Sequence, residues 1–396
     1  MEANVGLFNE SFPPVMDGVA VCVQNYAYWL QKKVGGVSVI TPNKSGANYS
    51  QYPYEVLDYI SVAVPFRHPY VTGLAQIDPL LRAKLARRRF KIVHAHSPFS
   101  AGLMAAQVAK SQNIPLVATF HSKFKDDFLK VVPSEMLVDQ AIKVVMEFFD
   151  RADEVWIPQA SVEEVIREYG YKGHVEVVDN GSDLVSDYPE SFFEDCRKAL
   201  GIEPNEFVLL FVGQHIWQKN VKLVIEGLER IKDLPFKMFF VGTGYAAAEM
   251  KALVEQKGLS SKVTFTGVLT EREQIVRYYA ASDLFLFPSL YDNAPLVVRE
   301  AAALHTPSVM VEGSTAATIL KDGRNGFLIS NDLDSFEACL RNLFKDRNLV
   351  KRAGLEAACT IVRSWEDVVG EVLDRYNAII ERKTRIRPLL AKGEKL

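Results

Sequence analysis

Two carboxylates stand eight positions apart and are the first residues of this sequence that could do chemistry together. They are Asp292 and Glu300, in the stretch SLYDNAPLVVREAAALHTP at residues 289–307. Such a pair can transfer protons or accept hydrogen bonds from the hydroxyl groups of a ligand. The two residues could also be structural, one as a charge near the positive end of a helix and the other in an ion pair.

The residues between the two carboxylates predict the start of a helix. A predicted strand, DLFLFPS, precedes them, Asn293 or Ala294 is suited to cap the helix, and Pro295 fits its first turn. The backbone amides of residues 294–297 would then lack partners inside the helix and could bind an anion. The first carboxylate would lie just outside this helix, and the second between one and two turns inside it.

Two further loops of the second half place small residues or a cation after predicted strands. Gly213 ends the strand FVLLFVG, and Lys219 follows near the start of the next helix, where a cation could meet a phosphate held by amides. In VGTGY, at 241–245, Gly242 would let a ligand approach the backbone. A solvated surface charge is an equally good interpretation of Lys219 taken alone.

Loops of the first half carry a glycine and histidines in similar places. Asp17-Gly18 opens a helical pattern, which could bring amides close to an anion or could be a simple turn. His121 directly follows the strand PLVATF, a place that favours ligand binding, although a lone histidine is more often structural. His94 and His96 are predicted to lie on opposite faces of a strand, to be poor joint metal ligands and to be structural.

Strands alternate with helices along the chain, which predicts parallel sheets with helices on both faces. The fold class is therefore α/β, with two doubly wound Rossmann-like domains facing a central cleft. The expected domains are 1–185 and 186–365, followed by a C-terminal helix with a basic tail, 366–396, that packs back toward the first domain. The apolar runs interpreted as strands are 5–8, 37–40, 90–96, 115–120, 154–158, 207–213, 236–244, 262–267, 283–288 and 307–313.

Length and composition are typical of a globular protein with two domains. Of the 396 residues, 48% are hydrophobic and 24% charged, and the formal charge is −3, so neither a disordered nor a nucleic-acid-coating protein is expected. The four cysteines lack CxxC spacing, which favours a reducing cytosol over a zinc site or a disulfide framework. No signal peptide or membrane-spanning segment is visible, so we expect a cytoplasmic protein.

Together these motifs resemble the retaining glycosyltransferases of family 4, whose two-Rossmann architecture is called GT-B. That family carries an E-x7-E signature followed by a run similar to EAMACGTPVV, and DNAPLVVREAAALHTPSVMV takes this place here, with Asp292 as the first acid. Further matches in order and spacing cover nearly the entire chain. They are FPxxxxGV at 12–19, HAHSP at 94–98, TFH at 119–121, NGSD at 180–183, VGxxxxxK at 212–219 and DGRNGFL at 322–328.

The resemblance implies an enzyme that transfers a hexose from a nucleotide-diphosphate sugar, UDP-glucose or a related UDP-sugar first of all, to a hydroxyl acceptor. The first domain would face the acceptor, and the second would bind the nucleotide sugar. In catalysis His121 would hydrogen-bond the donor sugar, Lys219 would neutralise the leaving diphosphate, and Asp292 would hold hydroxyls of the transferred sugar. The residues that would bind the donor are Gly18, Gln214, Lys219, Gly242, Val268, Leu269, Asp292, Asn293, Ala294, Pro295, Leu296, Val297 and Glu300.

The resemblance also implies how the reaction would proceed. Glu300 would accept hydrogen bonds from the ribose hydroxyls, so neither carboxylate of the opening stretch is expected to be an acid–base catalyst. The acceptor would attack on the face that the diphosphate leaves, and the leaving phosphate would help to remove the acceptor proton. Neither a metal nor another cofactor is expected, and the DxD at 332–334 is interpreted as a helix cap.

The sequence departs from the family pattern where the diphosphate would bind. Gln214 stands where the family usually has an arginine, and Gln218 where it has a glutamate. Glutamine donates hydrogen bonds but cannot supply the bidentate charge of a guanidinium. We therefore expect Lys219 to be the main diphosphate cation, helped by His215, Arg299 or a basic residue of the first domain.

The segment from Leu80 to Lys91 contains six basic residues and no acidic residue. In family members that glycosylate lipids, a basic amphipathic helix docks on an anionic membrane, and the diacylglycerol glucosyltransferases are the resemblance to test first. A solvated helix face is the alternative. The expected partners are a nucleotide sugar, a lipid or glycan acceptor and, through this segment, an anionic surface at the inner face of the cell membrane, but no nucleic acid.

Two other functions fit parts of the pattern. A GT-B-shaped sugar-nucleotide epimerase would bind the same donors, although the residues around Asp292 and Glu300 argue against it. A non-catalytic sugar-nucleotide-binding protein is supported only by the loss of the arginine at Gln214.

Overall fold

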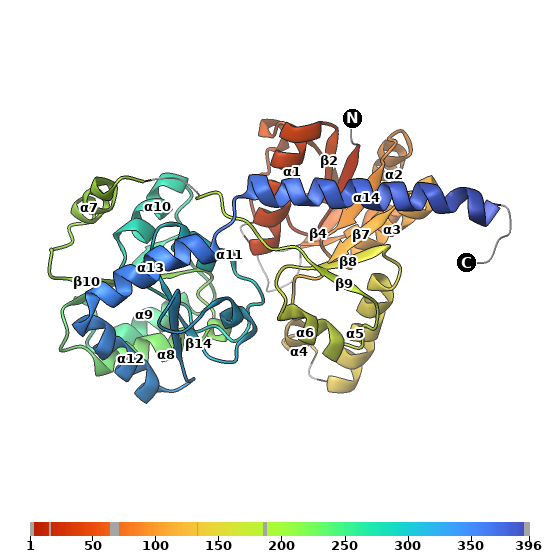
Figure 1. The fold of residues 1–396 in the computed structure, drawn as a ribbon. Coiled ribbons are helices and arrows are strands. Elements are labelled where there is room, and N and C mark those ends of the chain that lie inside the picture. The colour runs from red at the N-terminus through yellow and green to blue at the C-terminus, as the bar shows by residue number, and fades with distance from the viewer. Residues whose placement is uncertain (1–3, 16, 64–70, 133, 185–187, 392–396) are drawn as a thin grey trace. The chain divides into compact units, whose positions relative to one another are not determined.

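The computed structural model describes residues 4–15, 17–63, 71–132, 134–184 and 188–391. The chain divides into two compact units, one made of Met1–Asn180 with Trp365–Leu396 and the other of Gly181–Ser364. Each unit has its own parallel sheet with helices packed on it (Figure 1), which confirms the predicted α/β class with two Rossmann-like domains. Unit 1 is discontinuous in sequence, because its last helix follows the whole of unit 2.

The main sheet of unit 1 has seven parallel strands in the order β3-β2-β1-β6-β7-β8-β9. They are β1 (Val5–Phe8), β2 (Val37–Pro42), β3 (Glu55–Tyr59), β6 (Ile92–Ala95), β7 (Leu116–Thr119), β8 (Glu154–Ile157) and β9 (Val175–Val177). A short antiparallel pair, β4 (Ser61–Ala63) and β5 (Val71–Gly73), is separate from it. The strand order reverses between β1 and β6, and the loops after these neighbours carry Gly18 and His96.

The helices of unit 1 are α1 (Gly18–Val34), α2 (Pro79–Ala86), α3 (Ser100–Gln112), α4 (Phe124–Leu129), α5 (Glu135–Phe149), α6 (Val162–Glu168) and α14 (Trp365–Ala391), with 3₁₀ turns η1 (Tyr49–Gln51) and η2 (Ala75–Ile77). Helix α14 packs against α1, and its Trp365 and Tyr376 are almost completely buried. The indole of Trp156 on β8 stacks on the ring of Tyr376 with centroids 5.6 Å apart. Helix α14 is therefore part of the core of unit 1. Residues 392–396 of the predicted basic tail lie outside the described residues.

Unit 2 contains a parallel sheet of six strands in the order β12-β11-β10-β13-β14-β15. They are β10 (Phe207–Val212), β11 (Phe236–Val241), β12 (Val263–Gly267), β13 (Leu284–Leu286), β14 (Ser308–Val311) and β15 (Gly326–Ile329). The helices are α7 (Glu190–Ala199), α8 (Val221–Arg230), α9 (Ala247–Gln256), α10 (Arg272–Ala281), α11 (Leu296–Ala303), α12 (Leu333–Lys345) and α13 (Arg347–Ile361), with 3₁₀ turns η3 (Trp217–Lys219) and η4 (Thr315–Ile319). Here the order reverses between β10 and β13, so Lys219 and Asp292 follow neighbouring strands.

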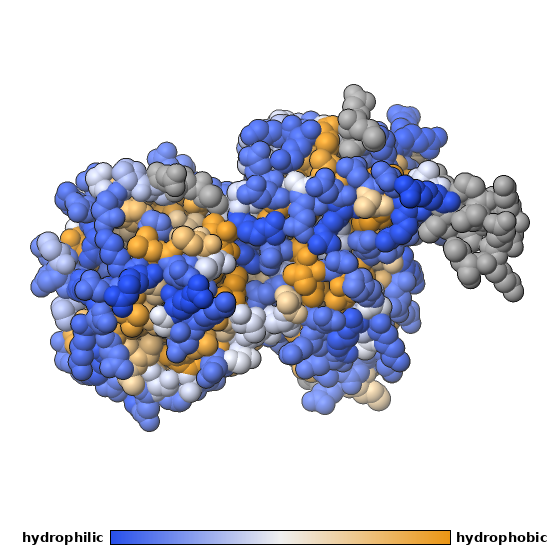
Figure 2. Space-filling view, in the orientation of Figure 1, coloured by the Kyte–Doolittle hydropathy of each residue, from blue (hydrophilic) through white to orange (hydrophobic). Residues whose placement is uncertain are grey.

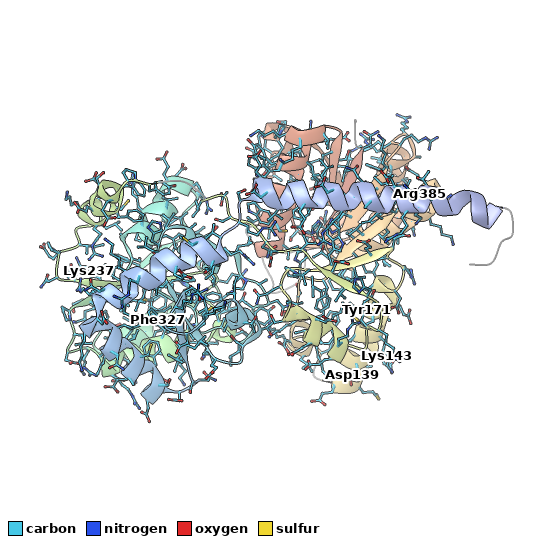
Figure 3. All side chains as sticks on the ribbon, viewed as in Figure 1. Asp139, Lys143, Tyr171, Lys237, Phe327 and Arg385 are labelled. Carbon is cyan, nitrogen blue, oxygen red and sulfur yellow. The ribbon has the colours of Figure 1, made fainter. Side chains whose placement is uncertain are left out.

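Apolar strand residues fill the space between each sheet and its helices, whereas charged side chains lie outside. Phe327 of β15 belongs to the core of unit 2, and Asp139 and Lys143 lie one turn apart on the exposed face of α5 (Figure 3). In the face shown in Figure 2, hydrophilic residues predominate on both units. Within the described parts of the chain, no helix combines the length and apolar character needed to cross a membrane.

Candidate active site

A largely buried ion pair joins the loops that follow β10 and β13. The Nζ atom of Lys219 lies 2.8 and 2.9 Å from the two carboxylate oxygens of Asp292. The hydroxyl of Ser289 donates a hydrogen bond of 2.5 Å to the same carboxylate, and the ammonium lies 5.0 Å from the centre of the Phe287 ring. The two side chains are only 11% and 18% exposed, so water screens their attraction weakly. The structure thus brings together two of the predicted catalytic residues.

Two glycine turns pack against each other next to this pair. Gly213 and Gly242 end β10 and β11 with φ of 150° and 128°, values that favour glycine. A Cβ atom on Gly242 would lie 2.1 Å from the carbonyl oxygen of Gly213. Gly242 was predicted to let a ligand approach the backbone. In the structure, the group that lies close to Gly242 is the backbone of the Gly213 turn.

The remaining loop residues of the predicted donor site also follow strands of unit 2. Gln214 lies between Gly213 and His215 in the turn after β10. Val268 directly follows β12 and is 54% exposed, and Leu269 packs partly against the core. All three therefore lie beyond the carboxyl edge of the sheet, where parallel sheets bind ligands.

Helix α11 starts at Leu296, and Pro295 is its N-cap residue. The prediction that Asn293 or Ala294 caps a helix containing Pro295 is therefore wrong by one or two residues. Pro295 has φ of −68°, which a helix would allow, but its ψ of 128° is extended. Pro295 is therefore the last residue of the loop and not the first residue of the helix. No cap side chain bonds to the first-turn amides, which include those of Leu296 and Val297, and they remain available for an anion.

Glu300 is held by two donors from α10. One carboxylate oxygen accepts from the guanidinium of Arg272 and the other from the hydroxyl of Tyr279, each at 2.9 Å. Arg272 also binds the carboxylate of Asp183, with Nε 3.0 Å from its oxygen. Burial, and then the charge of Glu300, raise the pKa of Tyr279 well above its usual value, which keeps its hydroxyl a donor.

Arg272 is a site residue that the sequence did not predict, as are Tyr279 and Ser289. It lies between Glu271 and Glu273 at the start of a helix and belongs to no motif. Only the packing of α10 on α11 places it beside Glu300. No feature of the sequence alone could have identified it.

Two residues expected to help Lys219 do not offer it a free positive charge. Burial, and then the charge of Lys251, lower the pKa of His215 to about 4, so that His215 is neutral near pH 7. Arg299 is 4% exposed, and its guanidinium donates a hydrogen bond of 2.7 Å to the carbonyl oxygen of Ile361 inside unit 2. The expectation of help from Arg299 is therefore wrong, and His215 would help only as a neutral hydrogen-bonding group.

In unit 1, Gly18 is the first residue of α1 and follows its cap, Asp17. A Cβ atom on Gly18 would meet nothing within 4 Å, so packing inside the chain does not require glycine there. The carboxylate of Asp17 accepts the amide of Ala20 at 2.8 Å. The Asp17 carboxylate therefore already binds one amide at the helix start where an anion was expected to bind. No atom of the chain covers Gly18 on the side of its missing Cβ.

His121 lies just beyond β7 and contacts His96. Their Nε2 and Nδ1 atoms share a hydrogen bond of 3.0 Å, and the two rings are nearly parallel with centroids 5.3 Å apart. Burial lowers the pKa of His121 to about 4, so the imidazole is neutral near pH 7 and can both donate and accept a hydrogen bond.

The prediction that His94 and His96 lie on opposite faces of a strand is wrong. Their rings stack with centroids 4.0 Å apart, because residues two positions apart on a strand share a face. His94 is completely buried, and its ring nitrogens bond to the hydroxyls of Tyr376 at 2.6 Å and Thr119 at 2.7 Å. His94 is therefore structural, as predicted.

The DxD at 332–334 caps a helix, which confirms its interpretation. The carboxylate of Asp332 accepts the amide of Ser335 at 2.7 Å at the start of α12, and Asp334 pairs with Arg230. Both acids are thereby engaged at the start of α12.

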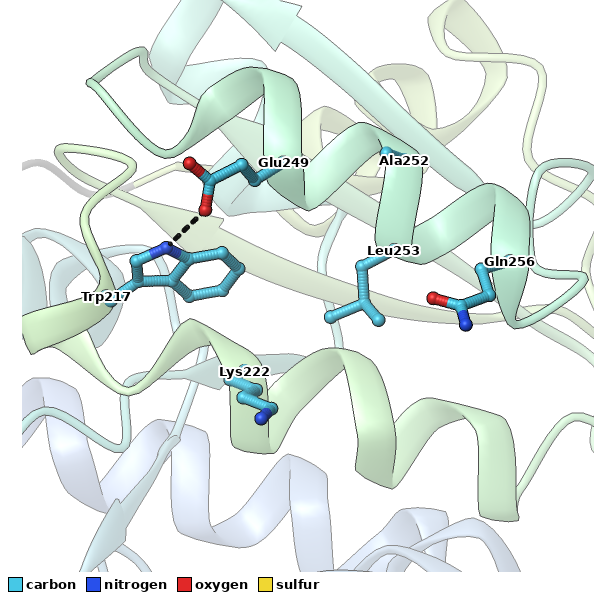
Figure 4. Close-up of a pocket in the computed structure, with 6 residues that line it drawn as sticks. All are labelled: Trp217, Lys222, Glu249, Ala252, Leu253 and Gln256. Atoms are coloured by element: carbon cyan, nitrogen blue, oxygen red, sulfur yellow. Dashed lines mark hydrogen bonds between the residues drawn. The ribbon is translucent and has the colours of Figure 1, made fainter.

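A surface groove of about 520 Å³ lies between α8 and α9 (Figure 4). The indole N–H of Trp217 donates a hydrogen bond of 2.9 Å to Glu249 across one end of it. The groove is lined by Trp217, Lys222, Glu249, Ala252, Leu253 and Gln256. No predicted site residue is among them, although Trp217 belongs to the same 3₁₀ turn as Lys219.

Comparison with known protein families covers both halves of the chain. A family model described as Glycosyl transferases group 1 matches residues 192–358, and one described as Glycosyltransferase Family 4 matches residues 16–185. The alpha-monoglucosyldiacylglycerol synthase of Acholeplasma laidlawii is 24% identical over 96% of this chain and 100% of its own length. The protein of the same name from Streptococcus pneumoniae is 24% identical over 86% of this chain and 78% of its own.

Solved structures share the fold over almost the whole chain. HepE of Anabaena, crystallised with UDP and glucose, superposes with a TM-score of 0.77 at 18% identity over 95% of this chain and 99% of its own. Sucrose-phosphate synthase of Thermosynechococcus elongatus gives a TM-score of 0.77 at 18% identity over 96% of this chain and 100% of its own. At this identity the likeness establishes the fold.

Proposed function

Because the chain belongs to glycosyltransferase family 4 and is a glycosyltransferase of the GT-B fold, we propose that it uses UDP-glucose or a related UDP-sugar. In this proposal the hexose passes to a hydroxyl of a lipid or cell-envelope glycan with retention of configuration, and no metal takes part. The observation that carries the proposal is the Lys219–Asp292 pair beside the uncapped start of α11, with Glu300 farther along the same helix.

Each part of this arrangement suits one part of a nucleotide sugar. The uncapped amides of Leu296 and Val297 suit the diphosphate, and the ammonium of Lys219 suits the charge that develops as the diphosphate leaves. Asp292 would accept hydrogen bonds from the sugar, and Glu300 from the ribose. Because Arg272 and Tyr279 already orient Glu300, the ribose would meet a fixed acceptor.

The proposal also gives roles to two residues of unit 1. Neutral His121 would hydrogen-bond a hydroxyl of the transferred sugar, and the open face of Gly18 would admit the diphosphate. Neither residue has the geometry or charge of a covalent nucleophile. The proposed displacement on one face needs none, since the leaving phosphate itself takes the acceptor proton.

The acceptor side of the proposal concerns the segment from Leu80 to Lys91. Arg82, Lys84, Arg87 and Arg89 are exposed on and after α2, and Arg88 pairs with Glu55. Leu80 is 72% exposed and Ile77, in the preceding turn, is 69% exposed. Exposed apolar side chains beside exposed cations suit the surface of an anionic membrane. The two relatives named as synthases of a glucosyldiacylglycerol support a lipid acceptor.

Incubation with a panel of sugar nucleotides tests this function. We expect release of UDP from one UDP-hexose, faster when diacylglycerol in anionic vesicles is added, and unchanged by a metal chelator. The product should carry the sugar in the anomeric configuration of the donor. Release of a different nucleotide, inversion of the anomeric centre, or a strict need for a divalent cation would overturn the corresponding part of the proposal.

A further inference from the structure

We propose that Cys22, His96 and His121 form a binding site for a divalent transition-metal ion of the Zn²⁺ class. The thiol sulfur and one nitrogen from each imidazole all lie within 4.8 Å of one another. Sulfur and imidazole nitrogen are the donors that Zn²⁺ prefers, and three protein ligands leave the fourth position of a tetrahedral ion open. The donor set is independent of the residues proposed to bind the nucleotide, except for His121.

The distances need little adjustment to hold an ion. Nδ1 of His96 and Nε2 of His121 are 3.0 Å apart, and two imidazole nitrogens on one tetrahedral Zn²⁺ lie about 3.3 Å apart. The corresponding separation of nitrogen and sulfur is about 3.6 Å. The sulfur of Cys22 lies at most 4.8 Å from either nitrogen, so about 1 Å of side-chain movement would bring it into range.

Rigid elements of unit 1 hold the three ligands. Cys22 lies on α1, four residues before Tyr26, whose ring packs edge-on against His96 with centroids 5.3 Å apart. His96 follows β6 and is stacked between His94 and His121. Ligands fixed by packing lose little conformational freedom when an ion binds.

Two of the three ligands, His96 and Cys22, have polar atoms with a poor or missing hydrogen-bond partner. Within the described residues, Nε2 of His96 is buried and has no hydrogen-bond partner. The contact between the Cys22 thiol and the amide oxygen of Asn180 is long, at 3.8 Å. Cys22 and His96 are 2% and 3% exposed, whereas His121 is half-buried, so an ion could enter on the side of His121. Because Nδ1 of His96 is the nitrogen that faces His121, the ion would replace the long contact of the Cys22 thiol and would leave Nε2 of His96 as it is.

Occupation of this site would have a defined consequence for the enzyme. His121 cannot at once bind an ion through the nitrogen that faces His96 and keep its present hydrogen bond. Zn²⁺ should therefore disturb the imidazole that the proposed function places against the donor sugar, and it should inhibit. The binding itself does not depend on the proposed function, so it is tested by spectroscopy.

Titration of the full-length protein with Co²⁺ and then Zn²⁺ tests the site. We expect one Co²⁺ per chain with a thiolate charge-transfer band and tetrahedral d–d bands, both displaced by Zn²⁺. Cys22→Ser should abolish the charge-transfer band and weaken Zn²⁺ binding more than about tenfold. Cys196→Ser, which changes a buried thiol of unit 2, should retain both signals and is the matched control.

The absence of the band in the wild type, or equal bands in wild type and Cys22→Ser, would overturn the proposal. If thermal melting shows that Cys22→Ser is unfolded, His121→Gln decides, because His121 is only half-buried. Loss of one bound Co²⁺ in that variant supports the site, and unchanged binding refutes it. Failure of the sugar-nucleotide panel together with a positive Co²⁺ titration would refute the proposed function alone.

Discussion

Lys219 donates to both carboxylate oxygens of Asp292, so the cation proposed for the diphosphate and the anion proposed for the sugar are partners in the structure. A donor would have to replace this one contact with two, by offering phosphate to Lys219 and hydroxyls to Asp292. An ion pair with little exposure to water is disrupted only when both charges find new partners. Ligands that offer a single partner should therefore bind weakly.

Replacement of Lys219 tests its role as the main cation of the diphosphate. Lys219→Ala should lower kcat by about 100-fold or more, since that is the usual cost of removing a group that stabilises charge in the transition state. Lys219→Arg should retain part of the activity. Lys222→Ala, which removes an exposed lysine three residues later, should leave kcat unchanged. If Lys219→Ala has normal turnover and Gln214→Ala has none, the assignment is wrong.

Replacement of Glu300 tests its contact with ribose. Glu300→Gln should weaken UDP binding by about 1.5–3 kcal/mol, the usual value of a hydrogen bond to a charged group. The same change should hardly affect a UDP analogue that lacks both ribose hydroxyls, as calorimetry can show. Arg272→Gln should also reduce the discrimination between UDP and the analogue, because Glu300 would lose one of its two anchors. Equal losses for UDP and the analogue would point to a structural effect only.

Glu10 predicts how stability depends on pH. Its carboxylate follows β1 and accepts the amide of Ala101 at 2.7 Å, and burial raises its pKa from 4.5 to about 7. The folded state therefore holds a proton that the unfolded state releases, so this stabilising contribution is full below pH 4.5 and is lost as the pH rises through 7. Glu10→Gln should remove this loss.

Denaturant unfolding at several pH values measures the effect of Glu10. The stability of Glu10→Gln relative to the wild type should increase between pH 5 and pH 8 by about 1–3 kcal/mol. Glu203→Gln, which changes an exposed glutamate of unit 2, should show no such trend. A difference that is constant with pH would mean that Glu10 is ionised in the folded protein.

Charge reversal on α2 tests the proposed membrane surface. Replacement of Arg82, Arg87 and Arg89 by glutamate should lower the affinity for anionic vesicles, measured by sedimentation, by more than about 100-fold. Each basic residue contributes about 1 kcal/mol near such a surface. Three glutamates at Lys198, Lys232 and Lys345, which are exposed on unit 2, change the net charge equally and form the control. Equal binding of both triple variants would exclude Leu80 to Lys91 as the docking segment.

The strands that the sequence identified are those with an uninterrupted apolar run. VGLF, FVLLFV and FKMFFV lie in the centre of a sheet, where both faces are buried, and each is a strand in the structure. The missed strands of the two main sheets are β3, β9 and β15, and the short pair β4 and β5 was missed as well. The first two lie at a sheet edge and carry polar residues, as in EVLDY and VEV, and β15 is the short edge strand GFLI. The strands β3 and β9 are only partly buried, so their sequences carry a weaker signal, whereas β15 is buried but has only four residues.

The site could be predicted where its residues belong to the loop, or to the helix start, that follows a strand. Lys219 and Asp292 lie together because their strands are neighbours, a relation that the alternation of strands and helices makes foreseeable. The neutrality of His215, the burial of Arg299 and the contact of Arg272 with Glu300 depend on how side chains pack between helices. Such packing cannot be predicted from the spacing of residues along the chain.

Helix α14 also affects the order in which the chain can fold during its synthesis. Unit 2 is continuous and can fold as soon as Ser364 has left the ribosome. Unit 1 must wait, although its first strands emerge earliest, because Trp156 and His94 lack their partner until Tyr376 arrives. For the time needed to make unit 2, the nascent chain therefore exposes an apolar face on unit 1. A chaperone that binds apolar segments should be found on stalled chains that end before residue 365, and it should leave chains that include α14.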